Sequence, residues 1–220
     1  MQRPFSTFVF VAVALTLQIT DATAQAVVEG EVQLPPTPAE LAPNQRYSTS
    51  GEVSPAPPEP CMAIVYLQGV FPQKVELKGQ PLVQMAQKNI TFAPGLLAVQ
   101  VGTTVEFPNL DDTYHNVFSY SKTKRFDLGR YRKDEKPGSV LFDKPGVVTT
   151  HCEVHEKMRG TILVLETPYF QKTDREGRYH LDHLPAGHYV LNAWINEKDL
   201  RTQQVDLKAN STQRVDFPAK

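Results

Sequence analysis

The sequence predicts an all-β protein built from short strands packed into sandwiches. Proline is abundant, at 18 of 220 residues, and apolar residues rarely recur at the spacing of a helix. Apolar and polar residues instead alternate in short runs that are separated by turn residues such as Pro145-Gly146. Several strands at this spacing are typical of a β-sandwich or barrel.

Residues 1–24 have the features of a secretory signal. A short basic start that includes Arg3 precedes an apolar stretch at residues 8–17, and Ala22-Thr23-Ala24 supplies small residues for cleavage. The stretch is too short to span a bilayer, although an uncleaved anchor is the alternative. No later segment is apolar enough to cross a membrane. We therefore expect a protein that is exported to the periplasm and has no membrane span after signal removal.

The mature chain would hold about 196 residues, enough for one large or two small domains. Its formal charge is −1, with no strongly acidic or basic tail. This balance gives no indication of a nucleic-acid partner.

Residues 25–61 read as an N-terminal strand followed by a proline-rich linker. Short Gly-Glu-Val runs at residues 30–32 and 51–53 are candidate edge strands beside it. The linker prolines are Pro35, Pro36, Pro38, Pro43, Pro55, Pro57, Pro58 and Pro60.

Strands are expected at regular intervals from residue 62 onward. The first set comprises residues 63–67, 83–92, 97–101, 104–107, 115–119, 139–143, 147–152 and 161–166. A second set comprises residues 178–181, 188–195, 201–207 and 213–217. The second set forms either a second small sandwich or extra strands on the first, and the pattern alone leaves both open.

Four residues form a candidate metal site. Cys152, His155 and Met158 lie within seven residues, in a loop between two expected strands, and His115 begins another strand. One thiolate, two imidazoles and one thioether are the donors that soft copper prefers. Zinc is the competitor, but structural zinc sites usually use four Cys or His groups. The third interpretation is a buried Cys and Met with two unrelated surface histidines.

The other cysteine, Cys61, opens a second alternative for Cys152. Two cysteines in an exported protein are commonly joined as a disulfide. A thiolate beside His155 and Met158 has a better use as a metal ligand, which would leave Cys61 as a small buried apolar residue.

Residues 81–166 resemble a cupredoxin, the blue-copper fold. The similar motifs are Val105-Glu106-Phe107-Pro108-Asn109, His115-Asn116-Val117, Pro145-Gly146 and the Cys-x-x-His-x-x-Met loop, whose short spacing is similar to that of amicyanin. The resemblance implies a Greek-key β-sandwich with one mononuclear type 1 copper site. It implies that the equatorial ligands are His115, Cys152 and His155, and that Met158 is the weak axial ligand.

Two neighbours of these ligands have roles implied by the same resemblance. Asn116 would tie the two ligand loops together by hydrogen bonds. His151 stands where plastocyanin-like members carry an aromatic residue, and strand alternation points it away from Cys152. We expect His151 not to bind the metal.

Residues 62–80 and 167–220 resemble a discontinuous carboxypeptidase regulatory-like β-sandwich. The similar segments are residues 63–69, residues 173–179 and residues 184–189. The two parts bracket the cupredoxin-like segment, an arrangement that resembles methylamine-utilisation-type cupredoxin proteins.

Two further groups have plainer explanations. His180, His183 and His188 fit scattered surface histidines better than a second metal site, because strand alternation separates them. The basic residues Lys122, Lys124, Arg125, Arg130, Arg132 and Lys133 are expected in a loop, either as solvated charges or as a docking patch for an acidic redox partner.

The leading functional hypothesis is an exported single-electron carrier that exchanges electrons with a redox partner protein. No catalytic triad, phosphate-binding glycine loop or paired catalytic carboxylates stands out, so we do not expect an enzyme. A copper-delivery module without a redox role is the main alternative. A small copper enzyme would require an open coordination position, which would exist if Met158 did not bind the metal.

Overall fold

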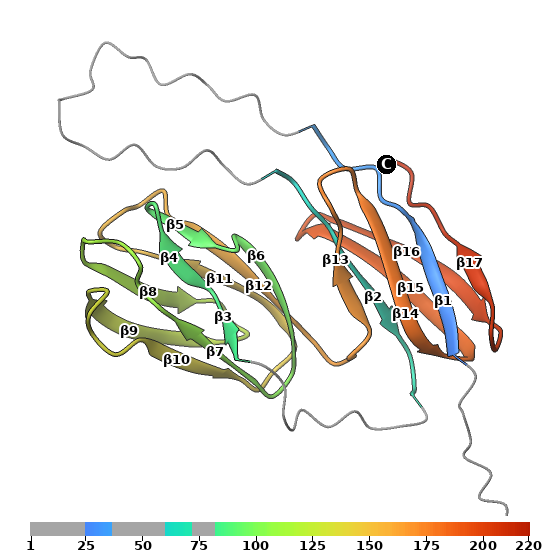
Figure 1. Ribbon diagram of the computed structural model, residues 1–220, viewed down its shortest axis with the longest axis horizontal. Helices are drawn as coiled ribbons and strands as arrows, with labels where there is room; N and C mark the ends of the chain where they lie inside the picture. Colours follow the sequence, from blue (N-terminus) through green and yellow to red (C-terminus); the bar gives the residue numbers. More distant parts are fainter. Residues whose placement is uncertain (1–24, 37–59, 72–81) are drawn as a thin grey trace, which may run out of the picture.

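The computed structural model describes residues 25–36, 60–71 and 82–220. The predicted signal at residues 1–24 and the candidate strand at residues 51–53 lie outside the described residues. Every regular element in the described part is a β-strand, which confirms the all-β class. The strands form two sandwiches that lie side by side (Figure 1). No helix in these residues is long and apolar enough to cross a membrane.

The first sandwich packs a three-stranded sheet against a five-stranded sheet. The smaller sheet has the order β10-β7-β3, formed by β10 (Gly138–Phe142), β7 (Thr103–Phe107) and β3 (Val83–Gln84). The larger sheet has the order β6-β12-β11-β8-β9, formed by β6 (Leu96–Gln100), β12 (Arg159–Leu165), β11 (Gly146–His151), β8 (His115–Tyr120) and β9 (Arg125–Tyr131). A hairpin of β4 (Ala86–Lys88) and β5 (Thr91–Ala93) adjoins them.

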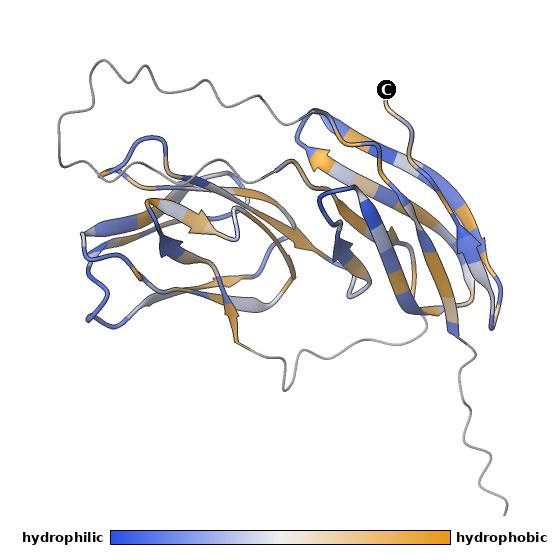
Figure 2. Ribbon diagram, turned by 45° about the horizontal axis from the view of Figure 1, so that its top comes forward, coloured by the Kyte–Doolittle hydropathy of each residue, from blue (hydrophilic) through white to orange (hydrophobic). Residues whose placement is uncertain are grey.

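The second sandwich packs a three-stranded sheet against a four-stranded sheet. The smaller sheet has the order β14-β1-β17, formed by β14 (Arg178–Pro185), β1 (Gln25–Glu31) and β17 (Thr212–Arg214). The larger has the order β13-β2-β15-β16, formed by β13 (Phe170–Lys172), β2 (Ile64–Gln68), β15 (Gly187–Asn196) and β16 (Asp199–Leu207). Figure 2 shows hydrophilic and hydrophobic residues alternating along these strands, as expected where one face of a sheet is buried.

The first sandwich is inserted between two neighbouring strands of the second. Strand β2 precedes it in the chain, strand β13 follows it, and the two pair antiparallel in one sheet. Both chain connections therefore lie at the same place on the second sandwich. Strand β1 belongs to this sandwich too, because it pairs with β14 and β17.

A third hydrophobic cluster joins the two sandwiches. Its buried members come from β2 and β15 on one side and from β12 on the other, and they are Ile64, Leu163, Leu165 and Trp194. Adjacent residues of β12 alternate between this cluster and the core of the first sandwich. Strands buried on both faces read as continuous apolar runs, which explains the sequence of β2 and β12.

The structure corrects two expectations about strands. Residues 83–92 are not one extended run but three short strands, because the chain reverses at Asn89 and Ile90, both with positive φ. The basic segment expected as a loop contains strand β9. Strand β13 has no counterpart among the strands expected from the sequence. Strand β9 lies at the edge of its sheet and carries exposed charges, a pattern that protects edge strands from pairing with other chains but resembles a loop.

Candidate metal centre

Two strand ends and one loop bring the predicted ligands together. Strand β11 ends at His151 and delivers Cys152, and the hairpin partner β12 begins just after Met158. His115 is the first residue of β8, which pairs with β11 through Phe118 and His151. The ligand loop lies at the end of the first sandwich farthest from the second (Figure 1).

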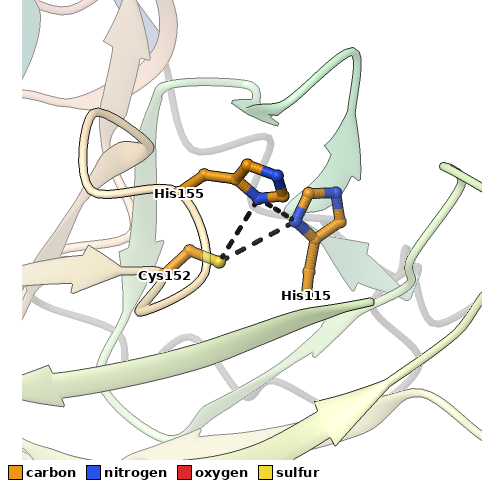
Figure 3. Close-up of side chains that lie close together, drawn as sticks. All are labelled: His115, Cys152 and His155. Atoms are coloured by element: carbon orange, nitrogen blue, oxygen red, sulfur yellow. Dashed lines mark hydrogen bonds between the residues drawn. The ribbon is translucent and has the colours of Figure 1, made fainter. Parts of the chain in front are cut away.

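His115, Cys152 and His155 converge on one point (Figure 3). The Cys152 Sγ lies 3.8 Å from Nδ1 of His115 and 3.9 Å from Nδ1 of His155, and the two nitrogens are 3.0 Å apart. The point equidistant from three atoms with these separations is about 2.1 Å from each, close to the ~2.0–2.3 Å of nitrogen and sulfur bonds to a zinc-sized ion. The three donors therefore fit one metal ion in a trigonal arrangement.

The surroundings of Cys152 favour its thiolate form, the form that binds metals. Burial opposes ionisation, but the His115 imidazole, the backbone N–H groups of Asn116 and His155, and the His155 imidazole form hydrogen bonds with the sulfur. Their combined effect lowers the pKa of Cys152 to about 6. These hydrogen bonds therefore favour the ionised sulfur, which is the form that binds a metal.

Asn116 links the ligand loop to β8. Its side-chain Oδ1 accepts a hydrogen bond of 2.8 Å from the backbone N–H of Glu153. The β8–β11 ladder has its only pair at Phe118 and His151, so Asn116 extends the connection toward the ligand loop with a side chain. The cupredoxin resemblance implies a tie of this kind for Asn116.

Met158 closes the ligand loop. Its backbone N–H donates to the carbonyl of His155 at 2.8 Å, and its side chain is fully buried in the same cluster as Cys152. The structure thus places the thioether in the interior at this end of the sandwich. Its bond to a metal stays a prediction.

The other cysteine and the neighbouring histidine stay apart from this group. Both cysteines are free, so the alternative of a Cys61–Cys152 disulfide is not formed. Cys61 is half-buried against the core of the second sandwich. The ring of His151 stacks on Phe118, with centroids 5.6 Å apart, and is not part of the donor group.

The second histidine group does not assemble. Among the described residues, the one group of His, Cys and carboxylate side chains close enough to hold a metal is His115, Cys152 and His155. His180 lies near Glu29, and His188 near Asp206.

Three of the six basic residues between the ligand strands form ion pairs. Ion pairs join Lys124 to Asp143, Arg130 to Glu153 and Lys133 to Asp112. Arg132 lies over the ring of Tyr114, with its guanidinium carbon 5.4 Å from the ring centroid. The role of the segment as a docking patch for an acidic partner stays a prediction.

Sequence reasoning missed one residue of the site, Asp111. Its Oδ2 lies 2.9 Å from Nε2 of His115, the ring nitrogen that faces away from Cys152. Burial acts to lower the pKa of His115, but hydrogen bonds with Cys152 and Asp111 outweigh it and raise that pKa. The signal in the sequence was a carboxylate four residues before a predicted ligand, which is too common to stand out.

Solved structures offer partial likenesses. A copper-containing nitrite reductase from Thermus scotoductus SA-01 is 26% identical over 43% of this chain, with a TM-score of 0.37, and the match spans about a quarter (26%) of that enzyme. A reduced amicyanin variant is 26% identical over 38% of this chain and 82% of its own, with a TM-score of 0.35. A purple cupredoxin from Nitrosopumilus maritimus is 23% identical over 38% of this chain and 99% of its own, with a TM-score of 0.34.

No protein-family model matches the sequence, and neither does any curated protein. The donor atoms of His115, Cys152 and His155 are the basis for assigning a metal.

Proposed function

We propose that the first sandwich is a cupredoxin-like domain holding one mononuclear type 1 copper. His115, Cys152 and His155 are its equatorial ligands and Met158 its weak axial ligand. The observation that carries this proposal is the convergence of one buried sulfur and two imidazole nitrogens within 4.8 Å of one another. Two His, one Cys and a distant thioether are the donor set of a blue-copper site, whereas a structural zinc site would normally replace the thioether with a fourth Cys or His.

The same geometry favours electron transfer over catalysis. When bound, copper supplies a one-electron couple between Cu(I) and Cu(II). Cys152 and His115 are buried, and Asn116 holds the ligand loop against β8. Ligands held in this way change little between the two oxidation states. With Met158 as fourth ligand no position is open to a substrate, so the protein is a carrier and not an enzyme.

Electrons would leave through His155, the half-exposed ligand. Two exposed apolar side chains adjoin the ligands in the chain: Tyr114, next to His115, is 48% exposed, and Val154, next to His155, is 40% exposed. We propose that the protein is exported to the periplasm through the signal at residues 1–24, and that its redox partner docks beside Tyr114 and Val154.

Copper loading of two cysteine variants tests the proposal. The Cu(II) protein should show an intense thiolate-to-copper absorption band in the visible region and the narrow hyperfine splitting of a type 1 site in spin resonance. Cys152→Ser should abolish both signals, and Cys61→Ser, the matched control, should keep them. A colourless copper adduct, or a band that survives in Cys152→Ser, would refute the copper site.

A second measurement separates the carrier from a delivery module. A carrier keeps its copper through repeated cycles of oxidation and reduction, and its voltammetric wave is reversible. A delivery protein would hold one oxidation state much more weakly and would lose metal to a chelator in that state. Loss of copper within the first cycles would favour the delivery module.

A further inference from the structure

His115 is held from two sides. Its Nδ1 faces Cys152 and His155, while its Nε2 lies 2.9 Å from Oδ2 of Asp111. The His115 side chain is fully buried, and that of Asp111 is 14% exposed. A proton on Nε2, donated to this carboxylate, leaves the lone pair of Nδ1 free for a metal.

Asp111 is itself fixed by a turn from another part of the chain. Its Oδ1 accepts a hydrogen bond of 2.7 Å from the backbone N–H of Asn89, and its Oδ2 accepts one of 3.0 Å from that of Ile90. The backbone N–H of Asp111 donates to Oδ1 of Asn109 at 2.9 Å. The carboxylate therefore has a single orientation, and that orientation points at His115.

The turn that holds Asp111 is conformationally costly. Asn89 and Ile90 join β4 to β5 with φ values of 55° and 59°. Asn tolerates the left-handed region, but a β-branched residue such as Ile90 rarely adopts it. Successive N–H groups in a tight turn form a concavity that binds an anion, and here the anion is Asp111. Positive φ at both residues is the geometry of a two-residue hairpin turn, and it aims both N–H groups at the carboxylate.

We propose that Asp111 is a positioning residue of the metal centre, acting through His115, and that the β4–β5 turn holds it in place. This inference rests on the copper site proposed above. Asp111 keeps the His115 ring turned with Nδ1 toward Cys152. Its negative charge also favours the more positive Cu(II) state over Cu(I), and thereby lowers the reduction potential of the centre.

A pair of adjacent substitutions tests the role. Asp111→Asn removes the charge at nearly constant shape, and Asp112→Asn removes the same charge one residue further on, where the side chain is 83% exposed and paired with Lys133. In copper-loaded Asp111→Asn, the affinity for Cu(II) relative to Cu(I) should fall about tenfold, which is a rise of ~59 mV in reduction potential for one electron. Asp112→Asn should change the ratio less than twofold, because water screens an exposed charge.

Two spectroscopic readouts separate positioning from mere support of the fold. The spin-resonance parameters of Cu(II) should change in Asp111→Ala, which releases the His115 ring, and should stay unchanged in Asp112→Asn. A residue that only stabilises the loop would lower the unfolding temperature and leave the potential and these parameters as they are. If Asp111→Ala does not fold, the potential of Asp111→Asn decides alone.

The outcomes also separate this inference from the copper site itself. A wild-type protein without the thiolate-to-copper band refutes the site and the role of Asp111 with it. A wild-type band with equal potentials in Asp111→Asn and Asp112→Asn refutes the role of Asp111 and leaves the copper site standing.

Discussion

Ile162 and Leu163 are adjacent in β12, yet their side chains are buried in different hydrophobic clusters. Ile162 lies in the core of the first sandwich, whereas Leu163 lies between the two sandwiches with Ile64 and Trp194. Successive residues of a strand point to opposite faces, so one strand serves both. The first sandwich is therefore packed directly against its neighbour, with the loop that joins β11 to β12 at the far end.

Truncation of Leu163 should measure how much this contact contributes to the free energy of unfolding. Leu163→Ala should lower the free energy of unfolding by about 2–5 kcal/mol, because the lost methyl groups leave a cavity between the sandwiches. Leu141→Ala is the control, since that leucine is 48% exposed, and it should change stability by no more than about 0.5 kcal/mol. Urea unfolding of the metal-free protein measures both. Equal losses in the two variants would contradict the contact.

Asn116 should matter to the metal more than to the fold. Asn116→Ala removes the acceptor for the Glu153 N–H, so we expect about 1–2 kcal/mol of lost stability and a copper affinity about 10–100-fold lower. Asp at this position still offers an oxygen, so Asn116→Asp should recover most of the affinity. Competition with a chelator gives the affinities. An Asp variant as weak as the Ala variant would show that the tie does not depend on this hydrogen bond.

Two buried methionines provide a matched test of the axial ligand. Met158→Leu and Met85→Leu both conserve volume in the core, so each should cost less than about 1.5 kcal/mol. Only Met158→Leu should alter the spin-resonance spectrum and raise the reduction potential, because loss of a donor destabilises Cu(II) more than Cu(I). An equal rise in reduction potential in Met85→Leu, or no rise in Met158→Leu, would refute the role of Met158 as axial ligand.

The exposed side chain of Val154 should affect the rate of electron exchange between copies of the protein. Val154→Lys places like charges opposite each other when two molecules meet through this face, so the self-exchange rate should fall about tenfold at low salt and recover partly at high salt. Val70→Lys introduces the same charge at a more exposed valine, 94% exposed, on the second sandwich and should not affect the rate. Line broadening in mixtures of reduced and oxidised protein measures the rate. Equal effects of both variants would place the exchange surface elsewhere.

Acid should weaken a contact that secures the C-terminus. The Arg201 guanidinium donates to Asp199 and to the carbonyls of Gln33 and Pro218, and its hydrogen bond lowers the pKa of Asp199 below its ordinary value. A depressed pKa contributes stability that is complete above the ordinary pKa of about 3.9 and is lost as the pH falls through the lower folded value.

Substitution of Asp199 measures that contribution. Asp199→Asn should cost about 1–2 kcal/mol at neutral pH, and its deficit relative to wild type should shrink from about pH 4 downward. Asp206→Asn, at an exposed site beside His188, should keep the acid dependence of the wild type. Thermal unfolding followed across pH 2–7, a range set by the ordinary carboxyl pKa, provides the comparison. A deficit independent of pH would contradict the ionic contribution.

Much of the metal centre was predictable because it is local in the chain. Cys152, His155 and Met158 share one hairpin loop, and a loop of seven residues brings its members close whatever the rest of the fold does. The alternation in residues 147–152 predicts that His151 points away from Cys152, and in the structure its ring stacks on Phe118 outside the donor group. The turn at Asn89 and Ile90 could not be found in this way, because a left-handed Ile contradicts the propensity of the residue.

The sequence by itself determined the all-β class, the strands with clear alternation and the hairpin that carries the ligand loop, since each follows from a local period of two or from turn residues. Only the tertiary structure decided how distant parts meet. His115 and Cys152 are 37 residues apart in the chain, and the pairing of β8 with β11 brings them together. Asp111 is held by a turn some 20 residues before it, and Leu163 finds its partners in another sandwich. Strand alternation shows which residues share a face, but which faces come together depends on the packing of the whole chain.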